Sequence, residues 1–241
     1  MKKSEIARQF DYKATSFLLT ASIALTVNSV LNNIVTNVEL PAAVHTIFVG
    51  LVSLFAIFAD IMTIKGFLTV NKSCKLSEDN QDYYMGKKLT IMTVLFVVLT
   101  IIFVFIGVFL SYLIAQYSVL ETLTKEDETA RMNIMILTAV VNILLQIVSI
   151  STPYIVYLWK LRSTIPAKDK LSDLALLTVI VMVVQLAIGI LNSSYIAKNS
   201  HSTFLTSFSE ILLTVKYIVL TAFLFLRRNS IIASVPEDEK E

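Results

Sequence analysis

The stretch that decides the fold is 89-LTIMTVLFVVLTIIFVFIGVFLSYLIAQ-116, which contains no Asp, Glu, Lys or Arg. An α-helix needs about 20 predominantly apolar residues to cross the hydrocarbon core of a bilayer, and this stretch is long enough. Other stretches of the chain meet the same criterion. The six predicted spans cover residues 15–36, 42–68, 89–116, 133–159, 173–194 and 204–226. The sequence therefore predicts an all-α integral membrane protein, a bundle of six transmembrane helices.

The composition agrees with this class. Hydrophobic residues make up 56% of the 241 positions and charged residues 16%, whereas soluble domains are about 45–50% apolar and about 25% charged. The segments between the spans are short and polar, so we expect a single six-helix transmembrane domain over residues 1–228. Residues 229–241 should form an acidic cytoplasmic tail that ends in "VPEDEKE" and stays solvated.

The basic residues predict the orientation, because cytoplasmic loops of membrane proteins are enriched in Lys and Arg. With the N-terminus in the cytoplasm, fifteen basic residues lie on the cytoplasmic side, and only Lys125, Arg131 and Lys198 lie outside. We therefore expect both termini to be cytoplasmic. Lysine is about three times as common as arginine and Gly and Pro are scarce, a bias typical of A/T-rich bacterial genomes. The predicted location is the bacterial cytoplasmic membrane, as a multi-pass protein.

Polar residues recur at helical spacing along most of the predicted spans, so each helix should have one polar or small face and one lipid face. The stripes include Ser22, Thr26, Ser29, Asn33 and Thr36 in the first span, Thr46, Gly50, Ser53, Ala56 and Asp60 in the second, and Glu210, Thr214, Tyr217 and Thr221 in the sixth. For Ser and Thr the favoured interpretation is hydrogen bonding between packed helices. The three large amides, Asn142, Gln146 and Gln185, could bond one another or line a hydrated seam.

Asp60 and Lys216 are the charges that lie deepest in the predicted spans. Lys216 is roughly 15 Å from either end of its span at 1.5 Å per residue, too deep for its side chain to reach water alone. A central charge costs about 2.5–3.5 kcal/mol on insertion scales, so Lys216 should be paired, neutral or beside a wet cavity. Because Asp60 lies at a similar depth, we expect an intramembrane Asp60–Lys216 ion pair, either structural or involved in handling protons or substrate.

Two further residues are candidates for a functional role. Glu210 lies nearer the outer face and points about 120° away from Lys216 around the helix, so it could line the outer mouth of a cavity or simply contact water. Pro153 removes a backbone hydrogen bond and should kink the fourth span.

The sequence lacks the motifs of common enzyme classes. No P-loop, HExxH or GxSxG motif occurs, and no Ser–His or paired-Asp arrangement of a membrane protease lies in the spans. The single cysteine, Cys74, excludes an intrachain disulfide, and two histidines make a conventional zinc or haem site improbable. We therefore expect no enzymatic activity, no cofactor and no metal. The basic loops are explained by topology, so no nucleic-acid partner is expected.

The leading functional hypothesis is a transporter, or the membrane (permease) subunit of one, with a path lined by Asp60, Lys216, Glu210, Asn142, Gln146 and Gln185. Its partners would be the lipid bilayer and a separate ATPase or another membrane subunit. The alternative is a protein that does not transport, either one that gives immunity against a bacteriocin or other membrane-active toxin, or an accessory subunit of a membrane complex.

Overall fold

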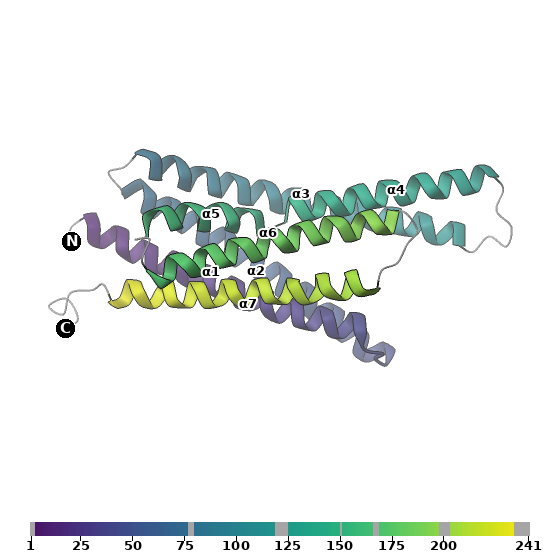
Figure 1. Cartoon of the computed structure of the whole chain (residues 1–241), viewed down its shortest axis with the longest axis horizontal. Coiled ribbons are helices and arrows are strands. Elements are labelled where there is room, and N and C mark those ends of the chain that lie inside the picture. Colours follow the sequence, from purple (N-terminus) through teal and green to yellow (C-terminus); the bar gives the residue numbers. More distant parts are fainter. Residues whose placement is uncertain are drawn as a thin grey trace.

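The computed structural model describes residues 3–76, 80–118, 125–149, 151–165, 169–197 and 203–233, and within these ranges the chain is helical without strands (Figure 1). The helices are α1 (Lys3–Asn37), α2 (Ala42–Leu76), α3 (Asn80–Ser118), α4 (Lys125–Ile147), α5 (Ser151–Thr164), α6 (Lys170–Ala197) and α7 (Thr203–Ala233).

Six helical segments in these ranges are long and apolar enough to cross a membrane, with α4 and α5 together forming the fourth. This confirms the all-α class and the six predicted apolar helical segments, and their lengths support a multi-pass membrane protein. The helices extend beyond the predicted spans where charged residues follow, since helical hydrogen bonding continues past the apolar stretch. For example, α1 begins at Lys3 and α7 continues to Ala233. The rest of the predicted acidic tail lies outside the described residues.

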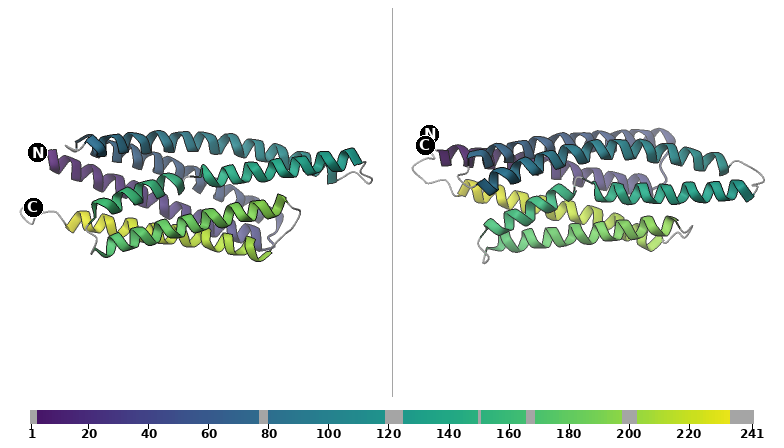
Figure 2. Two further views of the ribbon diagram at one scale, coloured as in Figure 1. Left: turned by 45° about the horizontal axis from the view of Figure 1, so that its top comes forward. Right: turned by 90° about the horizontal axis from the view of Figure 1, so that it is seen from above.

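The long helices lie side by side, and α1 begins at the same end of the bundle at which α7 ends (Figure 1). We call this the terminal end and the opposite one, where α1 leads into α2, the distal end. Neighbouring helices form a closed ring in which α1 packs on α2, α2 on α3, α3 on α4, α4 on α6, α6 on α7 and α7 on α1. The short helix α5 packs on α6 and, less extensively, on α3 (Figure 2).

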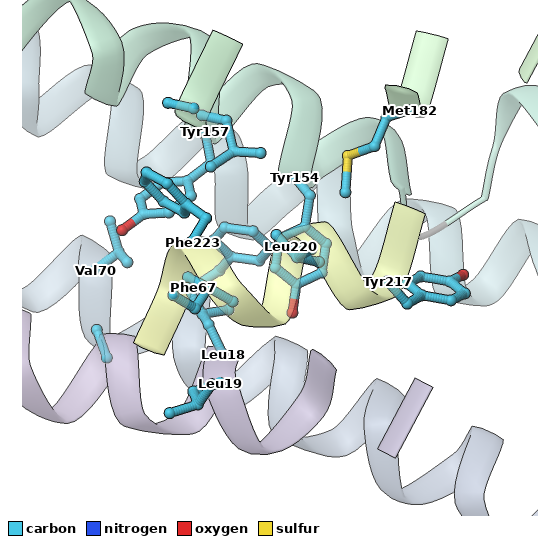
Figure 3. Packing of buried hydrophobic residues seen from close by; sticks show 14 of the residues in the cluster. Leu18, Leu19, Phe67, Val70, Tyr154, Tyr157, Met182, Tyr217, Leu220 and Phe223 are labelled. Atoms are coloured by element: carbon cyan, nitrogen blue, oxygen red, sulfur yellow. The ribbon is translucent and has the colours of Figure 1, made fainter. Parts of the chain in front are cut away.

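The hydrophobic core fills the terminal half of this ring. Tyr154 and Tyr157 of α5 are almost fully buried and pack against Phe67 of α2, with ring centroids 5.4 and 5.7 Å apart. Leu220 and Phe223 of α7 close the same cluster (Figure 3). The apolar side chains of α5 therefore join α2 to α7 across the ring.

The distal half is packed far more loosely. None of the residues 30–58, which form the end of α1 and the first half of α2, is buried. The predicted polar face of α2 is exposed there at Thr46, Gly50 and Ser53, and no other part of the chain comes within 4 Å of a Cβ placed on Gly50. This differs from the expectation that the whole stripe packs inward. The reason is that α1 and α2 diverge from α3 and α4 towards the distal end (Figure 1).

The fourth span is interrupted rather than only kinked, since α4 ends at Ile147 and α5 begins at Ser151. In a continuous helix the amide of residue 153 would donate to the Ser149 carbonyl, but proline has no N–H. Here the Thr152 amide donates to that carbonyl at 3.0 Å, and the Thr152 hydroxyl donates to the Ile147 carbonyl at 2.7 Å. Pro153 thus lies in the first turn of α5, where its missing donor is tolerated.

A polar seam joins α1 to α7. Thr214 bonds Ser29 at 2.7 Å and accepts from Asn33 Nδ2 at 3.0 Å, while Thr221 donates to Ser22 at 3.1 Å. These residues belong to the two stripes predicted for the first and sixth spans, so the interpretation of their Ser and Thr residues as packing contacts is confirmed. At the terminal end, an ion pair between Arg227 and Asp11 at 2.9 Å continues the contact.

The close approach of α1 and α2 depends on Gly66, because a Cβ at this position would lie 2.4 Å from Cδ2 of the fully buried Leu18. We expect Gly66→Ala to lower the free energy of unfolding by about 1–3 kcal/mol, as overpacking does in other cores. Unfolding with SDS in mixed micelles measures the change. Gly50→Ala is the matched control on the same helix and should be neutral or slightly stabilising; equal effects of the two variants would contradict the packing.

The polar seam gives a second test. Thr214→Val keeps the shape of the side chain but removes the shared partner of Ser29 and Asn33, and interhelical bonds of this kind average about 0.6 kcal/mol and reach about 1.7. We therefore expect a loss of about 1–2 kcal/mol in the same unfolding measurement. Thr20→Val is the control, because the exposed Thr20 hydroxyl bonds only the Ser16 carbonyl of its own helix. A loss no larger than that of the control would show that the seam adds little stability.

Candidate functional site

The most deeply buried charged side chain among the described residues is Lys216, near the middle of α7 and 2% exposed. Its ammonium donates to Gln185 Oε1 of α6 at 2.7 Å and to Ser151 Oγ of α5 at 2.9 Å. Gln185 and Ser151 are themselves 3% and 4% exposed. Three helices thus meet at one ammonium group in the interior of the bundle.

Ser151 sets this site beside the interruption of the fourth span, because it is the first residue of α5. The last turn of α4 carries the partial negative charge of a helix C-terminus, which favours a cation nearby. The site residue Ser151 was not predicted. A signal is present in the sequence, since Ser-Thr-Pro at 151–153 is typical of a helix start, but Pro153 predicted only a kink within one helix.

The third contact of the ammonium is aromatic. Lys216 Nζ lies 4.7 Å from the centroid of the Tyr217 ring, and Tyr217 is itself buried. A cation over an aromatic face gains electrostatic stabilisation that increases when water is excluded. The ammonium is therefore held by two neutral oxygen acceptors and one ring face.

The predicted Asp60–Lys216 ion pair does not form, as no ion pair joins these two described residues within 4.0 Å. Asp60 is partly exposed and lies within electrostatic range of the phenols of Tyr154 and Tyr217. Counting residues along two helices gives the depth of each charge but not its direction around the helix. The Lys216 side chain points to α5 and α6 instead.

The other predicted amides lie close to this site. The Gln146 carboxamide packs against Gly189 of α6, with its Oε1 2.9 Å from where a Cβ on Gly189 would lie. Gly189 is one helical turn from Gln185, so Gln146 and Gln185 contact the same stretch of α6. Asn142 lies one turn before Gln146 on α4 and is partly buried. Glycine at 189 is thus what allows a large amide to fit between α4 and α6.

Glu210 is not part of the Lys216 site. Its Oε2 accepts a hydrogen bond from Asn37 Nδ2 of α1 at 2.9 Å, close to the distal end of the bundle. This confirms that Glu210 and Lys216 point to different neighbours, as the helical spacing predicted. Of the six predicted site residues, the structure joins Lys216 to Gln185 directly and places Gln146 one helical turn along α6, whereas Asp60 does not bond Lys216 and Glu210 lies near the distal end.

The central group can hold a charge and exchange hydrogen bonds, but it has no arrangement of ligands for a metal. Within the described ranges no group of three or more His, Cys, Asp or Glu side chains could hold a metal ion. The chain matches no protein-family model, no curated protein and no solved structure.

The partners of Lys216 can be tested with two double-mutant cycles in the SDS unfolding measurement. Hydrogen bonds to charged groups contribute about 1.5–3 kcal/mol, so Lys216→Met and Gln185→Leu should be coupled by that amount. The cycle of Lys216→Met with Asp60→Asn should give a smaller coupling, because the two groups are not in contact. If the cycle with Asp60 gave the larger coupling energy, Lys216 would pair directly with Asp60. That result would contradict the geometry described above.

Proposed function

We propose that this chain is a multi-pass protein of the cytoplasmic membrane, with both termini in the cytoplasm, that acts as a transporter or as the membrane (permease) subunit of one. The observation that carries the proposal is the buried ammonium of Lys216, held by neutral oxygens beside an interrupted helix. Under this proposal the terminal half faces the cytoplasm and the distal half faces outwards.

The position of Lys216 supports a functional role over a purely structural one. An ionisable side chain near the middle of a membrane bundle costs several kcal/mol, on the order of 3 even on the milder scales, and such residues often belong to substrate or ion pathways. Helix contact alone would be made as well by an apolar side chain. Because no carboxylate among the described residues neutralises Lys216, its charge is available to an anionic group or to proton exchange.

The interruption between α4 and α5 supports the same proposal. Irregular backbone at membrane depth is tolerated only where protein buries it or where it lines a cavity. Transporters use such broken helices to bring backbone dipoles and polar side chains to a binding site near the bilayer midplane. Here Ser151, at the start of α5, is a direct ligand of the ammonium.

The uneven packing supports an outward-facing arrangement. The core closes the terminal half, whereas residues 30–58 of the distal half include no buried side chain. Asp60 and Lys216 lie near the middle of their helices, where the closed half meets the open half. Under the proposal, a solute that enters from the distal side meets the partly exposed Asp60 before it meets the packed aromatic core.

Flux across liposomes tests the proposal. We expect the purified protein to carry a solute or an ion, with proton, Na⁺ and K⁺ gradients as the first probes, and Lys216→Met to reduce the rate by about tenfold or more, the effect of losing roughly 1.4 kcal/mol of binding. Lys65→Met is the matched control, because Lys65 is exposed near the terminal end of α2. Equal rates for Lys216→Met and the wild-type protein would contradict the role of the site.

Thiol labelling gives an independent measurement of the path. Cys74 is the only native cysteine, so Cys74→Ser provides a cysteine-free background for single probes at Thr46 and Asn142. A membrane-impermeant maleimide added from outside should label both probes, and the reaction at Asn142 should be slower. Labelling from the cytoplasmic side only would exclude the proposed orientation.

A further inference from the structure

A groove between the distal ends of α1 and α7 is separate from the Lys216 site. Its cavity volume is about 440 Å³, within the range of about 300–1,000 Å³ that small-molecule sites occupy. The polar side chains of the groove are near the ends of the two helices, and they include Asn37, Ser207 and Glu210. Deeper along α1 and α7 the wall is formed mainly by the apolar Val30, Ile34 and Ile211, with Asn33 among them, whose Nδ2 donates to Thr214 at 3.0 Å.

The charge of the groove comes from one carboxylate. Oε2 of Glu210 accepts from Asn37 Nδ2 at 2.9 Å, which fixes the orientation of the carboxylate. The other oxygen, Oε1, has no hydrogen bond from any described residue, and Glu210 forms no ion pair within the described ranges. The groove therefore offers an oriented negative acceptor at its rim, without a basic side chain from the described part of the chain to neutralise it.

We infer that this groove binds an amphiphilic amine, a ligand that joins an ammonium group to an apolar portion. The ammonium donates to Glu210 Oε1, a charge-assisted bond of the stronger kind. The apolar part lies along Val30, Ile34 and Ile211, which are exposed or only partly buried in the empty groove. An anionic amphiphile would be repelled by Glu210, and a divalent metal would lack the six or more oxygen ligands typical of Ca²⁺.

This inference does not depend on transport. The groove binds its ligand whether or not the chain carries a solute through the Lys216 site, so a failed flux experiment leaves it intact. The ammonium has two possible sources, a phosphatidylethanolamine headgroup of the surrounding lipid or a free cationic amphiphile. Both present the same chemistry to Glu210, and the experiment separates them.

The test uses the full chain in phosphatidylcholine nanodiscs, with dodecylammonium as the probe and empty nanodiscs as the measure of partitioning into lipid. Glu210→Gln should weaken the protein-specific binding by about tenfold or more, because the charge-assisted bond is lost. The glutamine oxygen still accepts from Asn37, so the fold should persist, which the SDS unfolding midpoint checks. Glu39→Gln is the matched control: Glu39 is exposed in the α1–α2 connection, and its loss should leave binding unchanged.

Two further measurements test the geometry. Ile211→Trp should fill the apolar wall and weaken binding while Glu210 is retained. Dodecanol has the same chain without the charge, so its weaker binding should be the same in the wild-type protein and in Glu210→Gln. The inference is overturned if Glu210→Gln binds dodecylammonium as tightly as the wild-type protein does, or if dodecyl sulfate binds as tightly as dodecylammonium.

The source of the ammonium is identified by repeating the titration in nanodiscs that contain phosphatidylethanolamine. If this lipid competes with dodecylammonium in the wild-type protein but not in Glu210→Gln, the groove holds a lipid headgroup. If it does not compete, the groove is selective for a free amphiphile. Both results support the groove as an amine site.

Discussion

The structure depends on one constraint, the burial of an ammonium group without a carboxylate partner. Lys216 is held by Gln185, Ser151 and the ring of Tyr217, which belong to α5, α6 and α7. Each contact is weaker than an ion pair in an apolar medium, so all of them must be well placed at once. The arrangement of α5, α6 and α7 near the middle of the bundle brings these three contacts together.

The interruption of the fourth span contributes one of these contacts, the hydrogen bond with Ser151. A continuous helix from Lys125 to Thr164 would use the backbone groups near residues 147–152 for its own hydrogen bonds. The break frees this region, and Thr152 satisfies two of the carbonyls that the break exposes. Ser151 is then the first residue of a new helix and its side chain reaches Lys216. Pro153 therefore acts on the site indirectly, through the position at which α5 starts.

The sequence predicted the class of the protein well, because length and hydrophobicity alone decide whether a helix can cross a membrane. It also predicted the polar contact between α1 and α7, since helical periodicity gives the face of each stripe. It failed where the direction of a residue relative to other helices mattered. Asp60 and Lys216 lie at similar depths, but Lys216 faces α5 and α6, a direction that the sequence does not contain.

Two other features of the structure also differ from the prediction, the position of Ser151 and the exposed face of α2. Ser151 was missed because Pro153 was interpreted as a kink within one helix, and only the turn chemistry of Ser-Thr-Pro marks the start of a new helix. The exposed face of α2 at Thr46, Gly50 and Ser53 was also not foreseen, because a stripe of small residues shows that close packing is possible but not that a neighbour is present.

The break between α4 and α5 also has a mechanical consequence. A continuous helix transmits a tilt along its whole length, whereas two helices joined by a short irregular segment can change their angle independently. The short helix α5 is anchored in the aromatic cluster through Tyr154 and Tyr157, whereas α4 contacts α3 and α6. The two parts of the fourth span are thus held by different neighbours, so a change in the tilt of α4 need not be transmitted to α5.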